Sequence, residues 1–234
     1  VAPTIPETIE MAPPGGPPAP GGEYRVSGGG EAGPVKICSP HCGLEPGSNS
    51  GGAVYDRELL SAFARRGGYP IDEVHLPTPR TEVPSILSRH VEPTWPRIGW
   101  RWWYSAPLVA VAVRSCWTKH RPDILRAHSA RYVGPGCLLA RTGAPLVVHH
   151  HHLDGIWQER VDLAVLRRAD LVTTDSAWSA SRLAMAGIKN TAVIPAGVGD
   201  EFRSAVGRRT GKRLLFLGAL KDRKNPMALP HILR

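Results

Sequence analysis

Residues 145–194 read PLVVHHHHLDGIWQERVDLAVLRRADLVTTDSAWSASRLAMAGIKNTAVI, and this stretch decides the fold. Three short apolar runs, at residues 145–149, 171–174 and 191–194, alternate with two segments of helical periodicity. The second of these helices has a cap at Ser176 and a stop at Gly187. Strands that alternate with helices through short links predict a parallel sheet wrapped by helices.

The same alternation extends toward the amino terminus. Residues 77–96 are rich in proline and show no convincing periodicity, so we expect only loops and short helices there. Further strands are expected at residues 35–38, 71–76 and 123–127, and further helices are expected to begin at Gly51, Pro107 and Tyr132. The sequence therefore predicts an α/β fold: a Rossmann-like doubly wound parallel sheet, whose ligands bind beyond the carboxyl ends of the strands.

Composition divides the chain into three parts. Residues 1–34 are rich in proline and glycine and contain no apolar run, which predicts a disordered leader. Residues 35–202 are expected to form the Rossmann-like domain, and residues 203–234 a basic linker and the start of another domain, with a strand at 213–217. The leader has no targeting pattern and the longest apolar run, residues 106–113, is too short to cross a bilayer. We therefore expect a cytoplasmic protein.

The net charge of +9 admits three kinds of partner: nucleic acid, an anionic membrane surface or a phosphorylated substrate. No nucleic-acid-binding motif is present, so we expect no nucleic acid partner. The segment between Trp95 and Arg121 mixes tryptophans with cations such as Arg114 and Lys119. This mixture suits peripheral contact with the inner face of the membrane, and it equally suits a helix packed on the sheet with a solvated basic edge.

No metal site is predicted. Cys38 and Cys42 lack a second cysteine pair at zinc-finger spacing, so we interpret them as small residues that fill space at a strand end. The four histidines at residues 149–152 lie at the end of a strand, where alternate side chains point to opposite faces and cannot all converge on one ion. We expect neither a metal nor a cofactor.

Six blocks of the sequence are distinctive in their residues and their order. They are SGGAVYDRELL (50–60), PDILRAHS (122–129), PLVVHHHHLDG (145–155), ADLVTTDS (169–176), VIPAGV (193–198) and LFLGALKDRKN (215–225). Together they resemble the N-terminal, acceptor-side half of a family 4 glycosyltransferase of the two-domain GT-B type. Two positions depart from the family pattern: Ala219 stands where the family usually has Arg, and Ala196 where it usually has Asn.

The resemblance implies a retaining transferase that passes a sugar from a nucleotide-sugar donor to an unidentified acceptor: a glycan, a lipid-linked acceptor or a small molecule. The paired glutamates by which the family's second domain holds the donor do not occur in these 234 residues. The resemblance thus implies an N-terminal fragment that stops as the donor-side half begins. The alternative is a non-catalytic acceptor-binding domain or a gene remnant.

The resemblance also assigns roles to particular residues. It places His151 beside the donor sugar, Gly51, Gly52 and Lys224 near the donor phosphates, and His128 and Ser129 at the acceptor. Simpler interpretations stay open: the glycine pair as turn residues, Ser129 as a helix cap, and His151 as a residue lining a polar loop. Because parallel strands share one carboxyl edge, we expect Gly52, His128 and His151 to gather there.

Overall fold

The computed structural model describes residues 35–42, 44–47, 51–66, 73–80, 82–95, 102–151 and 156–197. Within them every neighbouring pair of strands is parallel, and the sheet order is β3-β2-β1-β4-β5-β6-β7. The elements are β1 (Lys36–Cys38), α1 (Gly51–Arg66), β2 (Glu73–Pro79), η1 (Ser85–His90), β3 (Val91–Trp95), α2 (Trp102–His120), β4 (Ile124–Ala127), α3 (Gly134–Ala140), β5 (Leu146–His149), α4 (Ile156–Leu166), β6 (Leu171–Thr174), α5 (Ala177–Met185) and β7 (Thr191–Val193).

This architecture confirms the predicted Rossmann-like, doubly wound α/β fold. The strands expected within residues 145–194 appear as β5, β6 and β7, and the Ser176 hydroxyl caps α5 by accepting a hydrogen bond from the Ser179 amide at 3.2 Å. The expected leader at residues 1–34, and the linker and strand expected after residue 202, lie outside the described residues.

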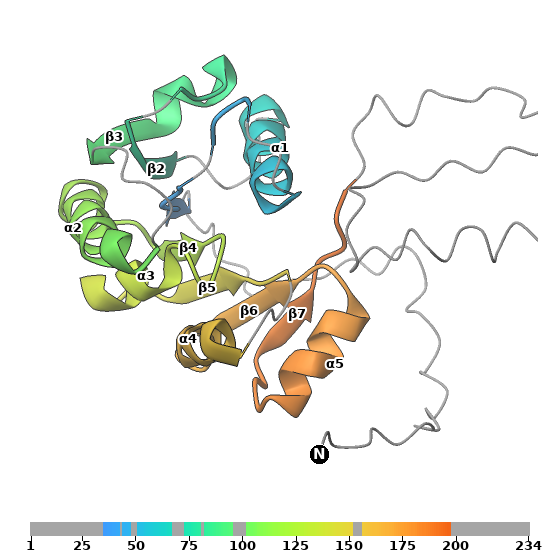
Figure 1. Ribbon diagram of the computed structural model, residues 1–234. Coiled ribbons are helices and arrows are strands. Elements are labelled where there is room, and N and C mark those ends of the chain that lie inside the picture. The colour runs from blue at the N-terminus through green and yellow to red at the C-terminus, as the bar shows by residue number, and fades with distance from the viewer. Residues whose placement is uncertain are drawn as a thin grey trace, which may run out of the picture.

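Helices cover both faces of the sheet (Figure 1). The chain moves from β1 to β2 in one direction along the sheet and from β4 to β7 in the other, so right-handed crossovers place their helices on opposite faces. α1 contacts η1 on one face, while α2, α3 and α4 form a contacting row on the other. Each face therefore has its own apolar core, the smaller one formed by Leu44, Leu60, Leu76 and Leu87.

The larger core lies between the sheet and the α2–α3–α4 row. Val109 and Val113 of α2 and Val148 of β5 are almost fully buried in it. Cys38 and Cys137 are buried there as well, where a thiol behaves as a small apolar group. Burial raises the pKa of the Cys137 thiol, which therefore stays protonated at neutral pH.

Two glycines allow α3 to approach its neighbours closely. A Cβ atom added to Gly134 would lie 2.7 Å from Cγ1 of Val165 in α4. A Cβ atom added to Gly136 would lie 2.5 Å from Cβ of Val109 and 2.9 Å from the carbonyl oxygen of Ala106, both in α2. Because backbone and branched side chains cannot move aside cheaply, the spacing of these helices requires glycine at both positions.

Gly136→Ala is expected to lower the free energy of unfolding by about 1–3 kcal/mol, because the added methyl group overpacks the contact between α2 and α3. Urea unfolding of the two proteins measures the difference. Gly47→Ala is the matched control, since a Cβ atom at Gly47 would have no neighbour within 4 Å. Equal loss of stability in both variants would contradict the packing argument.

The structure differs from the sequence prediction in the proline-rich region. Residues 77–96 contain η1, a short helix of the kind expected there, and also the strand β3, which was not predicted. β3 is an edge strand, the position in a sheet that tolerates a proline such as Pro93. The next helix begins at Trp102 instead of Pro107, so Pro107 is its sixth residue and lies inside the helix.

Trp95 is the first aromatic residue of the segment that we suggested could face a membrane. It is only 4% exposed and packs in the larger core, so it does not face a membrane. Farther along the segment, the guanidinium of Arg121 lies 5.9 Å from the centre of the Trp117 ring, a distance typical of a cation–π contact. No helix among the described residues combines the length and apolar character needed to cross a bilayer.

Candidate functional site

The chain adds strands in one direction from β1 to β3 and in the opposite direction from β4 to β7, so the order reverses between β1 and β4. In doubly wound folds, ligands bind in the crevice outside the carboxyl ends of the strands at this switch point. Two groups of polar residues lie on the segments that leave the strands there and on the amino-terminal half of α1. We call them the Asp56 network and the His151 group.

The Asp56 network joins α1 to the ends of β1 and β4. Asp56 is 1% exposed, and its Oδ2 accepts a hydrogen bond from Nε2 of His41 at 2.8 Å. Arg126, on β4, forms an ion pair with the same carboxylate and donates from Nη1 to the Ser39 hydroxyl at 3.2 Å. The buried carboxylate is therefore balanced by a guanidinium and an imidazole.

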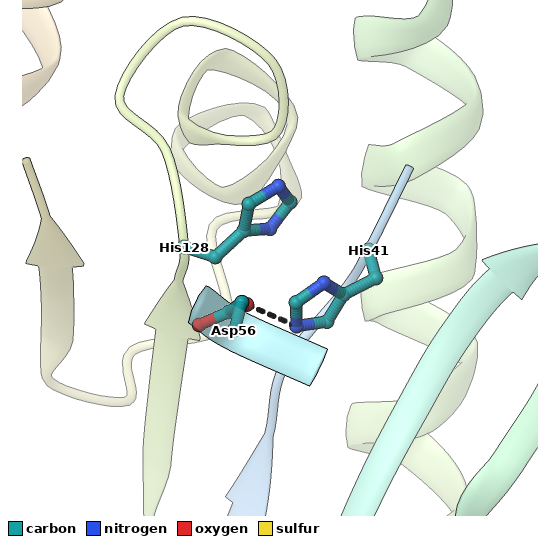
Figure 2. Close-up of side chains that lie close together, drawn as sticks. All are labelled: His41, Asp56 and His128. Carbon is teal, nitrogen blue, oxygen red and sulfur yellow. Dashed lines mark ion pairs between the residues drawn. The ribbon is translucent and has the colours of Figure 1, made fainter. Parts of the chain in front are cut away.

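His128 completes the Asp56 network directly after β4. Its ring stacks on the ring of His41, with centroids 4.2 Å apart and planes inclined by 6°. Its Nδ1 donates to the carbonyl oxygen of Pro40 at 3.2 Å, so this nitrogen carries the proton. Figure 2 shows His41, Asp56 and His128 converging from three segments that are far apart in the sequence.

Burial and neighbouring charges set the protonation states of the Asp56 network. Burial alone would raise the pKa of Asp56, but the charges of Arg126 and His41 outweigh it and hold that pKa well below its ordinary value. Burial, reinforced by His41, lowers the pKa of His128 to about 3. Near neutral pH the carboxylate is thus ionised and the His128 ring neutral.

Donor atoms of His41, Asp56 and His128 lie within 4.8 Å of one another, which is close enough for one metal ion. The Asp56 carboxylate, however, already pairs with the Arg126 guanidinium. A divalent cation there would have to displace that charge or lie beside it, and like charges repel strongly in a buried site. We therefore interpret this cluster as an ion-pair network and not as a metal centre.

The His151 group lies around the end of β5. The His149 ring stacks on Tyr55 of α1, with centroids 5.0 Å apart, and contacts the edge of the His151 ring at 4.4 Å. Nδ1 of His149 and the Thr173 hydroxyl are 3.0 Å apart, while Nδ1 of His151 lies 3.8 Å from a carboxylate oxygen of Asp175. Side chains from α1, from β6 and from the residue after β6 therefore hold the two imidazoles.

His149 and Tyr55 are both neutral near pH 7. Burial, together with the nearby His151, lowers the pKa of His149 to about 4. Burial also raises the pKa of the Tyr55 phenol above its ordinary value. Nε2 of His149 is buried and has no hydrogen-bond partner within the described part of the chain, so it remains available to hydrogen-bond a ligand or water.

Gly52, at the start of α1, lies directly against His151. A Cβ atom added to Gly52 would be 3.4 Å from both Cδ2 and Nε2 of the His151 ring. The first backbone amides of a helix have no intrahelical partner and attract anions. A histidine therefore meets the anion-attracting end of a helix at the switch point.

The structure thus places Gly52, His128 and His151 at the predicted edge of the sheet, Gly52 against His151 and His128 in the neighbouring network. Ser129 is engaged locally, because its hydroxyl accepts from the amides of Arg131 at 3.2 Å and Tyr132 at 3.4 Å. It does not cap α3, whose cap residue is Val133. Gly51 is the first residue of α1.

Lys224, the predicted phosphate contact, lies outside the described residues. The sequence reasoning also missed several members of the site: His41, Tyr55, Asp56, Arg126, His149 and Asp175. Tyr55 and Asp56 could have been named as candidates from the sequence, because they belong to the distinctive block at residues 50–60. The pairing of Asp56 with Arg126 joins residues 70 positions apart, which no local pattern reveals.

The sequence model of glycosyltransferase family 4 matches residues 49–202, more than half of the 234 residues. The chain belongs to glycosyltransferase family 4. The match includes Gly52, Tyr55, Asp56, Arg126 and His151, so most of the site lies inside the family region, while His41 precedes it. No curated protein matches this family 4 chain significantly in sequence.

Solved structures share the fold of this family 4 chain. Sucrose-phosphate synthase from Thermosynechococcus elongatus superposes with a TM-score of 0.55 at 18% identity, over 70% of this chain and 48% of its own. A UDP-N-acetylglucosamine 2-epimerase gives 0.51 at 13% identity, over 68% and 48%. The apo lipopolysaccharide outer core galactosyltransferase WaaB gives 0.50 at 13% identity, over 70% and 46%. The chain thus spans about half the length of these proteins.

Proposed function

We propose that this chain is the acceptor-side half of a retaining, nucleotide-sugar-dependent glycosyltransferase. The proximity of Gly52 to the His151 ring at the switch point carries the proposal. It brings the anion-attracting start of α1 next to a histidine at a strand end, which is the arrangement needed to hold a sugar diphosphate. Membership of family 4 supports sugar transfer as the reaction.

In the proposed reaction, the acceptor oxygen forms a bond to the anomeric carbon while the bond from that carbon to the donor diphosphate breaks. The acceptor hydroxyl passes its proton to an oxygen of the departing diphosphate, and the nucleoside diphosphate leaves. The amides at Gly51 and Gly52 offset the growing negative charge on the diphosphate, with Lys224 as a further cation. His151 contacts the donor sugar close to the reacting carbon.

On this proposal, His128 and Ser129 face the acceptor side of the crevice, and the Asp56 network positions them. Nδ1 of His128 is engaged by the Pro40 carbonyl, so only Nε2 is left for an acceptor hydroxyl. No metal is required, because the helix start and cations supply the positive charge. The chemical nature of the acceptor is left to the experiment.

The chain by itself is expected to bind donors weakly and to transfer sugar slowly. Holding two reactants in register lowers a barrier by roughly 7–11 kcal/mol in well-oriented reactions, and a two-domain enzyme achieves this by closing both domains over the donor. Because this chain spans about half of its structural relatives, we propose that the second wall of the cleft comes from a donor-side domain.

A panel of UDP-, GDP- and ADP-sugars tests the proposal through amide shifts of the ¹⁵N-labelled chain and through nucleotide release with and without acceptors. We expect weak, saturable shifts at Gly51 and Gly52 with one nucleotide class. Any acceptor-dependent release should fall roughly 100-fold or more in His151→Ala, because a group that stabilises the transition state is lost. His90→Ala, on η1, is the matched control.

The other outcomes separate the alternatives. Shifts scattered away from α1, or release that His151→Ala leaves intact, would contradict the site. Absence of shifts with every donor would favour a non-catalytic acceptor-binding domain. Donor turnover without acceptor transfer would indicate different chemistry on the same fold. The anomeric configuration of any product, read by NMR, decides whether transfer proceeds with retention.

A further inference from the structure

A second cluster of potential metal ligands lies outside the candidate functional site. It consists of His75 on β2, Glu92 on β3 and His120, the last residue of α2. One donor atom from each lies within 4.8 Å of the others. Oε1 of Glu92 is 2.6 Å from Nε2 of His120 and 3.5 Å from Nδ1 of His75.

The cluster lies where β2 and β3 meet the last turn of α2. α2 ends at His120 and leads through a short link into β4, so its last turn lies near the amino ends of the strands. The side chains of His75, Glu92 and His120 are 14%, 22% and 20% exposed.

The simplest alternative is an ion pair between Glu92 and protonated histidines. The two imidazole rings stack with centroids 3.6 Å apart and planes inclined by 20°. Two imidazolium cations in such face-to-face contact would repel each other, so this arrangement suits at most one protonated ring. The ammonium of Lys119, 3.7 Å from the same Glu92 oxygen, already supplies a positive charge. Glu92 therefore has a cationic partner that does not depend on either imidazole.

We propose that His75, Glu92 and His120 bind a zinc ion that ties β2, β3 and the end of α2 together. Two imidazole nitrogens and one carboxylate oxygen form a donor set that zinc prefers, with water as the fourth ligand. The stacked rings tilt apart to direct their lone pairs at one ion, and Lys119, whose side chain is 65% exposed, withdraws into solvent.

This zinc site differs from the Asp56 network in one decisive respect. The carboxylate of Asp56 is held by a guanidinium that is 15% exposed, whereas the cation beside Glu92 is a largely exposed lysine. An exposed ion pair is weak and easily replaced. The inference concerns the stability of the fold and does not depend on the proposed glycosyltransferase activity.

The test uses the metal-free chain titrated with Zn²⁺ by calorimetry, with Co²⁺ as a spectroscopic probe. We expect one bound ion per chain, visible absorption of tetrahedral Co²⁺, and a melting temperature higher by roughly 5–10 °C when free zinc is about 100-fold above its Kd. His120→Ala should weaken zinc affinity at least 100-fold or so, because a direct ligand is lost.

Matched variants locate the ion. His90→Ala should leave zinc affinity unchanged, because Nδ1 of His90 lies against the Val74 carbonyl, outside the cluster. Glu92→Gln keeps the size of the side chain and removes its charge, so it tests the site even if His120→Ala fails to fold. Zinc binding that persists in His75→Ala and Glu92→Gln, that disappears only in His128→Ala, or that is absent from the unaltered chain would overturn the proposal.

Discussion

Arg126→Ala should lower the free energy of unfolding by about 3–5 kcal/mol. The substitution removes one partner of a carboxylate that is 1% exposed, and an uncompensated buried charge is strongly destabilising. His41 alone then faces the ionised Asp56. Urea unfolding at neutral pH measures the loss, with Arg114→Ala, at an exposed position of α2, as the matched arginine control.

A paired variant separates the ion pair from the packing around it. Arg126→Met combined with Asp56→Leu removes both charges and retains apolar volume, so it should be more stable than Arg126→Ala alone. If Arg126→Ala unfolds at the same urea concentration as the unaltered chain, the Asp56 network contributes nothing to the fold. If the paired variant is less stable than the single one, Asp56 stabilises the fold through partners other than Arg126, such as His41.

Acidification from pH 7 to pH 4 should destabilise the domain by an amount on the order of 6 kcal/mol, with about 3 kcal/mol from each of two histidines. The pKa of His128 is lowered to about 3 and that of His149 to about 4, against an ordinary value near 6.5. Between the unfolded and the folded pKa, each histidine binds a proton in the unfolded chain but not in the folded chain. The stability contributed by the neutral histidines is therefore complete above pH 6.5 and is lost as the pH falls toward 4 and then 3.

Asp56 contributes to acid sensitivity in a lower pH window. Its folded pKa is held well below the ordinary value, so its contribution is present above about pH 4 and lost only as the pH falls through the folded pKa. Thermal unfolding at pH 7, 5.5 and 4 distinguishes the groups. The double variant His128→Gln, His149→Gln should show a flatter stability profile above pH 4. An unchanged slope would mean that other residues cause the acid sensitivity.

The fold was predictable where the sequence repeats short apolar runs and capped helices. β6 and the Ser176 cap follow from residues 169–176, because both depend on neighbouring residues. The edge strand β3 was not predictable in the same way. Its sequence, VEPTW, contains a proline, and only its place at the end of the sheet makes that proline acceptable.

The site was predictable only as far as chain order determines it. Gly52 and His151 each follow a strand, and parallel strands bring such positions to one edge. Arg126 was missed because it alternates with the buried Leu125 and Ala127, a pattern that indicates a solvent-facing residue. β4 is an inner strand of a sheet covered on both faces, so a charge in the middle of it requires a buried partner. The sequence does not say that the partner is Asp56.

The first two turns of α1 carry Gly52, Tyr55 and Asp56, and so one helix belongs to both polar groups. An anion bound at the start of α1, as proposed, and protons taken up by the Asp56 network would therefore act on the same helix. Such effects are reciprocal. If protonation of the network weakens ligand binding by some factor, the bound ligand weakens proton binding by the same factor. On the proposed function, the acid response of this domain and its affinity for a phosphorylated donor should therefore be linked through α1.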